Sequence, residues 1–185
     1  VPEFDIPTAA IESEINQLKT MEAKKGYLEQ IFKDDQAVRD SERAAQLMTQ
    51  YGTDSEEYME YVKAQWKQDA INLVKIEKYM DAYGHPKKSE VGAAADAPWI
   101  VIHHSQGYEA RERNFEKIYA AYLNVDFDDG AISFYLGRMH DMKYGKMLDI
   151  ESPFTTEDEV NQLTKKLGLE EKKARVEEQI KKENG

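Results

Sequence analysis

The sequence predicts an all-α fold, and three features of its composition and patterning support that class. Charged residues make up 33% of the chain, while only ten glycines and five prolines occur, which favours long exposed helices over a turn-rich sheet. Apolar residues recur at intervals of three and four along most of the chain. A hydrophobic fraction of 41% in 185 residues is enough for one core. We therefore expect a single helical-bundle-like domain of about six to eight helices.

The first half of the chain predicts two long helices that pack antiparallel. The first covers residues 8–51, and Gly26 is either a break or a weak point within it. The second follows Thr53 or Asp54, both of which are favoured N-cap types, and it ends in the Gly-His-Pro sequence at residues 84–86.

Shorter helices are expected in the middle of the chain. The apolar sequence "WIVI" has strand propensity, but no partner strand is predicted beside it. A helical turn at residues 93–95 followed by a buried helix over residues 98–104, with proline in its first turn, fits the pattern better. Two further helices are predicted over residues 108–124 and 128–145, the second ending at a glycine.

The C-terminal part predicts a helical extension. We divide the chain into a helical domain at residues 1–150 and an extension at residues 151–185, which either packs on that domain or frays from it. Thr155 or Thr156, followed by Glu159, resembles a capping box at the start of this extension.

Composition excludes several classes of function. The formal net charge of −11 repels phosphate backbones and anionic membranes, so nucleic acid is not an expected partner. No apolar run approaches the ~20 residues that span a bilayer. The absence of cysteine excludes disulfides, thiolate zinc sites and a cysteine nucleophile. The chain begins at Val1 without methionine, and we expect that an N-terminal segment was removed. That segment was either a signal peptide or a stretch lost by trimming, so both a cytoplasmic and an exported location stay open.

Polar residues at helical positions point to a site. Asp35 and Arg39 are four residues apart, with Gln36 between them, and on spacing alone an exposed intrahelical ion pair is the favoured interpretation. The alternative is an inward network that needs partners on another helix. Asp69 and Asn72 are such partners, since both residue types have poor helix propensity and neither lies at a cap.

The histidines give a weaker signal. His103 and His104 are consecutive and point about 100° apart on a helix, so they are poorly placed to bind one metal. His140 lies near a helix end, where the dipole explains it, whereas Arg138 would have to meet an acid if it were buried. The chain has no HExxH pair, glycine-rich phosphate loop or GxSxG elbow, and we expect neither a metal nor a cofactor.

Taken in order, the motifs "DDQAVR", "DAINLVKIEKYMDAYGHPKKSEVGAAADAPWIVIHHSQ" and "YLGRMHDMKYGK" resemble the bacterial domain of unknown function DUF6624. The resemblance covers about residues 28–145. Two positions depart from the family pattern: His103 stands where the family has glutamine, and Gly137 stands where it has aspartate. The second departure removes a carboxylate, so that an acid-base role would be lost or would move to Asp141. The matching positions are Asp35, Gln36, Arg39, Asp69, Asn72, Gly84, Pro86, Gly92, His104, Arg138, Tyr144 and Gly145.

The residues and the resemblance together predict a polar pocket between helices. Arg39 and Arg138 would hold an anionic group, and Asn72 and Gln36 would orient it by hydrogen bonds. Histidine is the side chain that changes charge near neutral pH, which singles out His104. The predicted ligand-binding residues are Asp35, Gln36, Arg39, Asp69, Asn72, His104 and Arg138.

Two classes of function follow from this pocket. In the first, the domain binds a small polar or anionic ligand, or a protein partner, without chemistry. In the second, it is an enzyme that uses His104 as general acid or base with Asp35 or Asp69.

Overall fold

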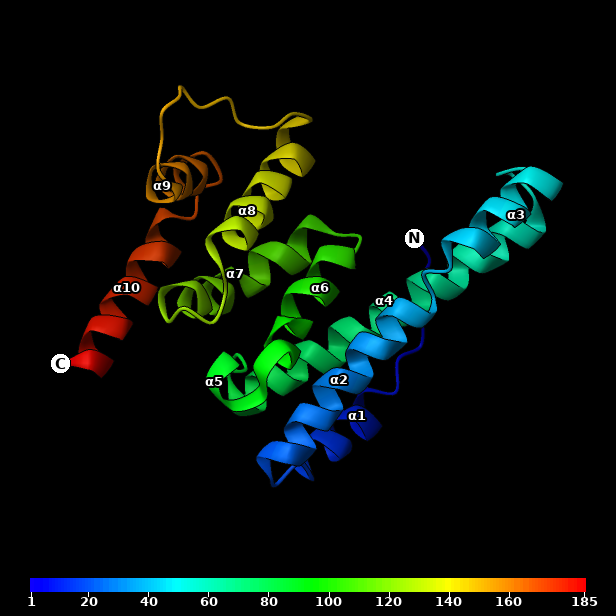
Figure 1. The fold of residues 1–185 in the computed structure, drawn as a ribbon, viewed down its shortest axis with the longest axis horizontal. Helices are drawn as coiled ribbons and strands as arrows, with labels where there is room; N and C mark the ends of the chain where they lie inside the picture. The colour runs from blue at the N-terminus through cyan, green and yellow to red at the C-terminus, as the bar shows by residue number, and fades with distance from the viewer. The chain divides into compact units, whose positions relative to one another are not determined.

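The computed structural model describes all residues, Val1–Gly185, and is all-α without strands, as predicted (Figure 1). Eight helices are nine residues or longer, at the upper end of the expected number. None of the helices combines the length and apolar composition needed to cross a bilayer. The elements are α1 (Thr8–Asn16), α2 (Met21–Ala37), α3 (Ser41–Tyr51), α4 (Glu56–Tyr83), α5 (Lys88–Val91), the 3-10 helix η1 (Gly92–Asp96), α6 (Ala97–His104), α7 (Tyr108–Leu123), α8 (Asp129–Tyr144), α9 (Thr156–Lys166) and α10 (Glu170–Asn184).

The helices gather into two compact units. Unit 1 contains residues 1–84 and 88–106, and unit 2 contains residues 85–87 and 107–185. The predicted boundary at residue 150 stays a prediction.

In unit 1 the long helices α2 and α4 pack antiparallel, as predicted, and lie side by side in Figure 1. Tyr27 near the start of α2 stacks on Tyr79 near the end of α4, with ring centroids 6.4 Å apart. Just after the end of α2, Arg39 meets Asp69 in the middle of α4 at 2.6 Å. From one contact to the next, the residue numbers therefore rise along the α2 segment and fall along α4, which shows that the two run antiparallel.

The helix predicted over residues 8–51, with Gly26 as its one possible break, is three helices, which corrects that expectation. Gly26 lies inside α2 as a weak point, and the breaks fall elsewhere. Thr20 accepts a hydrogen bond from the Ala23 backbone N–H and starts α2, and Asp40 accepts one from the Arg43 backbone N–H and starts α3. Side chains that bond the backbone in this way compete with a continuous helix. The apolar spacing continues across both breaks, which is why the pattern hides them.

Two other predicted helix starts differ in detail. Ser55, rather than Thr53 or Asp54, caps α4 by accepting from the Tyr58 backbone N–H at 3.2 Å. Thr155 caps α9, as predicted, but its capping box uses Asp158 instead of Glu159.

The "WIVI" segment is helical, as predicted, and it forms the core of α6. Pro98 occupies the first turn, and Val101 and Ile102 are fully buried where α6 packs on α2 and α4. The alanine-rich turn before it is η1. Because α6 ends at His104, its last side chains are delivered beside α2.

Unit 2 is built from α7 to α10. Helix α8 ends at Gly145 in the left-handed conformation, as predicted from the sequence. The tail packs rather than frays, because Val176 of α10 is buried and Glu177 accepts a hydrogen bond from the Tyr119 hydroxyl of α7 at 2.6 Å.

Candidate functional site

A buried carboxylate lies at the centre of the candidate site in unit 1. Asp35 follows Leu28 and Ile31 along the inward face of α2 and is 0% exposed. Its Oδ1 lies 2.9 Å from His104 Nδ1 at the end of α6, and its Oδ2 accepts from Gln36 Nε2 at 2.8 Å. A buried carboxylate has to be hydrogen-bonded to stay ionised, and here both oxygens are occupied.

The Asp35 carboxylate also determines which ring nitrogen of His104 carries the proton. An ionised carboxylate only accepts hydrogen bonds, so the Nδ1 atom of His104 carries the proton. The Nε2 atom makes no hydrogen bond, and the side chain is 25% exposed. In the neutral ring this second nitrogen is therefore an acceptor that solvent or a ligand can reach.

Arg39 connects this pair to α4. Its Nη2 donates to Asp69 Oδ1 at 2.6 Å, and its Nη1 donates to the Asp35 carbonyl at 2.8 Å and lies 3.4 Å from Asp35 Oδ1. The intrahelical pair favoured on spacing alone is present, but its side chains are 17% and 1% exposed and it belongs to a network across two helices. Two carboxylates already compensate the guanidinium charge.

Asp69 is the acid of this network whose pKa is shifted. Burial raises its pKa above the usual range of aspartate, and the negative charge of Asp35 acts in the same direction. The hydrogen bond and the charge of Arg39 pull the pKa down but do not cancel the burial. Asp69 therefore takes up a proton at higher pH than an exposed aspartate.

Asn72 lies one turn further along the same face of α4 and is 0% exposed. Its Oδ1 accepts from Gln68 Nε2 at 2.9 Å, whereas its Nδ2 is buried and donates no hydrogen bond. Along α4, Asn72 lies between two contacts with the α2 segment. One is the Arg39–Asp69 ion pair, and the other joins Lys75 Nζ and Asp34 Oδ2 over 4.0 Å. An unsatisfied buried donor is unusual in a folded protein.

Arg138 belongs to unit 2 and has another partner. Its side chain is 48% exposed and pairs with Asp141 at 2.6 Å on the same helix, so the burial that would have singled it out is not observed. Nearby, Gly137 is buried, and a Cβ atom there would meet Met147 Cε at 2.9 Å. His140 bonds the Lys146 carbonyl at 2.7 Å, in agreement with its assignment to a helix end.

His103 does not share the position of His104. Its ring lies against Trp99, with centroids 5.0 Å apart, and leaves the contact with Asp35 to its neighbour. The structure thus brings six of the seven predicted residues into unit 1. Hydrogen bonds link five of them, and the sixth, Asn72, lies one turn beyond Asp69 on α4. Nowhere in the chain do three His, Asp or Glu side chains form a metal-ligand arrangement.

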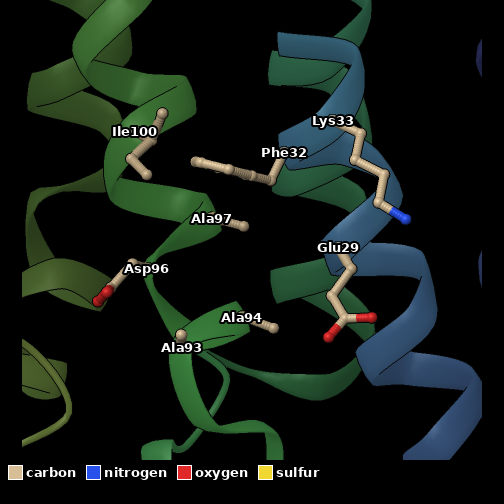
Figure 2. Close-up of a pocket in the computed structure, with 8 residues that line it drawn as sticks. All are labelled: Glu29, Phe32, Lys33, Ala93, Ala94, Asp96, Ala97 and Ile100. Carbon is tan, nitrogen blue, oxygen red and sulfur yellow. The ribbon is translucent and has the colours of Figure 1, made fainter. Parts of the chain in front are cut away.

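A groove that the sequence did not reveal lies between α2 and the segment η1–α6, and none of the seven predicted site residues lines it (Figure 2). It holds about 530 Å³ and is lined by the apolar side chains of Phe32, Ala94, Ala97 and Ile100. The apolar spacing of α2 assigns Phe32 to the core, yet it is 41% exposed. The signal that could have found the groove is the run of alanines facing it, which leaves no side chain long enough to cover the ring.

Comparisons with known proteins add no identification: no family model, curated protein or solved structure matches the chain. The resemblance to DUF6624 accordingly stays a prediction.

Proposed function

We propose that unit 1 binds a small polar molecule at the His104 end of the α2–α6 groove. The observation that carries the proposal is the His104 imidazole, which a buried carboxylate holds at Nδ1 and which is open at Nε2. A side chain fixed in this way loses little conformational freedom when it binds a ligand.

The charges favour a neutral or cationic group over an anion. Asp35 and Asp69 carry two negative charges against the single positive charge of Arg39, so the three residues sum to −1 while His104 is neutral. An anion at Arg39 would have to compete with two carboxylates already in contact with it. The anionic ligand expected from the sequence, held by Arg39 and Arg138, is the less supported form of this proposal.

The binding function is tested by following the imidazole signals of the four histidines by NMR while a mixture of small metabolites is added. We expect the His104 signals to shift and those of His140 in unit 2 to stay unchanged. His103→Ala removes the ring whose centroid lies 5.3 Å from that of His104 but leaves the Asp35–His104 contact in place, so the His104 signals should still shift in this control variant. Loss of the shift in His103→Ala, or no shift in the native protein, would contradict the proposal.

A second candidate function is general acid-base catalysis, favoured by the 2.9 Å contact between Asp35 and His104. This contact leaves the lone pair of the neutral ring on Nε2, where it can accept a proton from a bound molecule. Turnover of a metabolite that is lost in both Asp35→Asn and His104→Ala would favour catalysis. Binding that persists without turnover would favour the first candidate.

A further inference from the structure

The groove beside Phe32 has the size and shape of a small-molecule site. It holds about 530 Å³, within the range of ~300–1,000 Å³ typical of ligand pockets. Figure 2 shows the Phe32 side chain reaching from α2 across the space toward Ala97 and Ile100 of α6. The ring stacks on no other aromatic side chain and is 41% exposed, so one face is available to a flat apolar group.

One end of this groove points toward the turns of α2 and α6 that carry the Asp35–His104 pair, although neither of these residues lines the groove. Phe32 lies one helical turn before Gln36 on α2, and Ile100 lies one turn before His104 on α6. The two helices run in the same direction along the groove, since Glu29 lies level with Ala94 at one end and Lys33 lies level with Ile100 at the other (Figure 2). The ligand site inferred below therefore extends one helical turn beyond the groove, from the Phe32 ring toward His104.

The opposite end of the groove carries negative charge. Glu29 lines it, and its only ion-pair contact is with Lys25 at 3.9 Å, where both side chains are about half exposed. Lys33 also belongs to the lining, but Figure 2 shows its ammonium group directed away from the Phe32 ring. The charge that a ligand meets at this end is thus that of a loosely paired carboxylate, in a chain with a net charge of −11.

We propose that the groove binds an aromatic amine with a hydrogen-bond donor at the end remote from the ammonium group. The ammonium group pairs with Glu29, the ring packs between Phe32 and the alanines, and the donor reaches His104 Nε2. Glu29 and Gln36 are seven residues apart, which corresponds to about 10 Å along a helix, close to the length of a phenol bearing an aminoethyl chain. This inference rests on the proposed function, because it gives the chemical class of the ligand at the His104 site.

Three probes that share one ring test the inference by titration calorimetry on the full chain: tyramine as the cation, tyrosol as the neutral analogue and 3-(4-hydroxyphenyl)propanoate as the anion. We expect tyramine to bind on the order of tenfold more tightly than the anion, with tyrosol between them, because the charged contact is partly exposed. Glu29→Gln should lower the affinity for tyramine to that for tyrosol. Glu22→Gln, which makes the same charge change on the same helix outside the groove, should leave all three affinities within about twofold.

Two further variants test the apolar part of the groove. Phe32→Ala removes the ring and should weaken all three probes about fivefold to tenfold, and Ala94→Leu should weaken them by filling the space. Both positions are at least partly exposed, so folding is expected to survive, and the Tm of each variant checks this. Absence of binding by every probe at millimolar concentration, or equal affinity for cation and anion, would overturn the inference.

The same titrations separate this inference from the proposed function. If tyramine binds and shifts the His104 signals but Glu29→Gln has no effect, the site at His104 stands and the cationic class is wrong. If tyramine binds with the expected dependence on Glu29 and Phe32 while His104 is unaffected, the groove stands and the role given to His104 is wrong.

Discussion

The contact between Asp35 and His104 holds the site together, and a double-mutant cycle measures its strength. The cycle compares the free energies of unfolding of the native protein, Asp35→Ala, His104→Ala and the double variant. Asp35 also receives hydrogen bonds from Gln36 and lies beside Arg39, so each single variant loses more than one interaction. The cycle cancels these other losses and leaves the energy that couples the two side chains.

The geometry sets the expected size of that coupling. A hydrogen bond to a charged group contributes ~1.5–3 kcal/mol, and Asp35 is buried on its side of a 2.9 Å contact. His104 is a quarter exposed, which brings the expected coupling to about 1–2 kcal/mol. Asp35→Ala alone should cost about 2–4 kcal/mol, because it leaves several donors without their buried acceptor. His104→Ala should cost less, since Gln36 and Arg39 still contact the carboxylate.

The chain offers a convenient assay for this cycle. Its two tryptophans, Trp66 of α4 and Trp99 of α6, both lie in unit 1 together with Asp35 and His104. Fluorescence during urea unfolding therefore reports the unit that contains the contact. A coupling below about 0.5 kcal/mol would refute the reasoning, because it would mean that the two side chains do not interact in solution.

Three other predictions concern buried positions. Asp69→Asn should weaken the dependence of stability on pH. The raised pKa of Asp69 means that, just above the ordinary aspartate pKa, the folded state binds more protons than the unfolded state, so the stability of the native protein falls as pH rises through that window. Urea unfolding of both proteins at several pH values measures the difference. Asn72→Leu should change the free energy of unfolding by less than about 1 kcal/mol, because the cost of the unsatisfied Nδ2 is removed together with the one hydrogen bond that Oδ1 accepts from Gln68; urea unfolding measures the change, and a loss above about 2 kcal/mol would contradict this. Gly137→Ala should raise the Tm slightly, because a helical glycine costs ~1 kcal/mol relative to alanine and the atom that the new Cβ would meet, Met147 Cε, is the movable end of an exposed side chain. Gly137→Asp, by contrast, should lower the Tm because it buries a carboxylate.

The sequence predicted the helices better than their breaks. Period and propensity act over ten or more residues, so the all-α class and the antiparallel pair α2–α4 follow from them. A break depends on a single backbone bond, such as the one that Thr20 accepts from Ala23, and serine, threonine and aspartate are too frequent along the chain to mark it. Gly26 drew attention as a weak residue, yet tertiary packing carries α2 through it.

For the site, the informative residues were those that lower the stability of the helix in which they lie. Asp69 and Asn72 disfavour the middle of a helix, and both are buried in the cluster. The groove could not be found in this way, because an exposed Phe32 follows from the small size of alanines that are more than sixty residues away in the chain. Arg138 was included through its place in the motif, and the structure gives it a partner on its own helix.

The chain of contacts through Arg39 ties the position of His104 to a residue that does not touch it. Asp69 holds one nitrogen of the Arg39 guanidinium, and the other nitrogen bonds the carbonyl of Asp35, the residue whose side chain fixes the imidazole. Burial makes the Asp69 charge costly, and an apolar residue there would pack without that cost. With such a residue, Arg39 would keep its positive charge close to Asp35 but lose its anchor on α4, and its side chain would be free to turn toward solvent. For the proposed function this anchor matters, because binding or catalysis at Nε2 would require the Asp35–His104 pair to stay in one orientation.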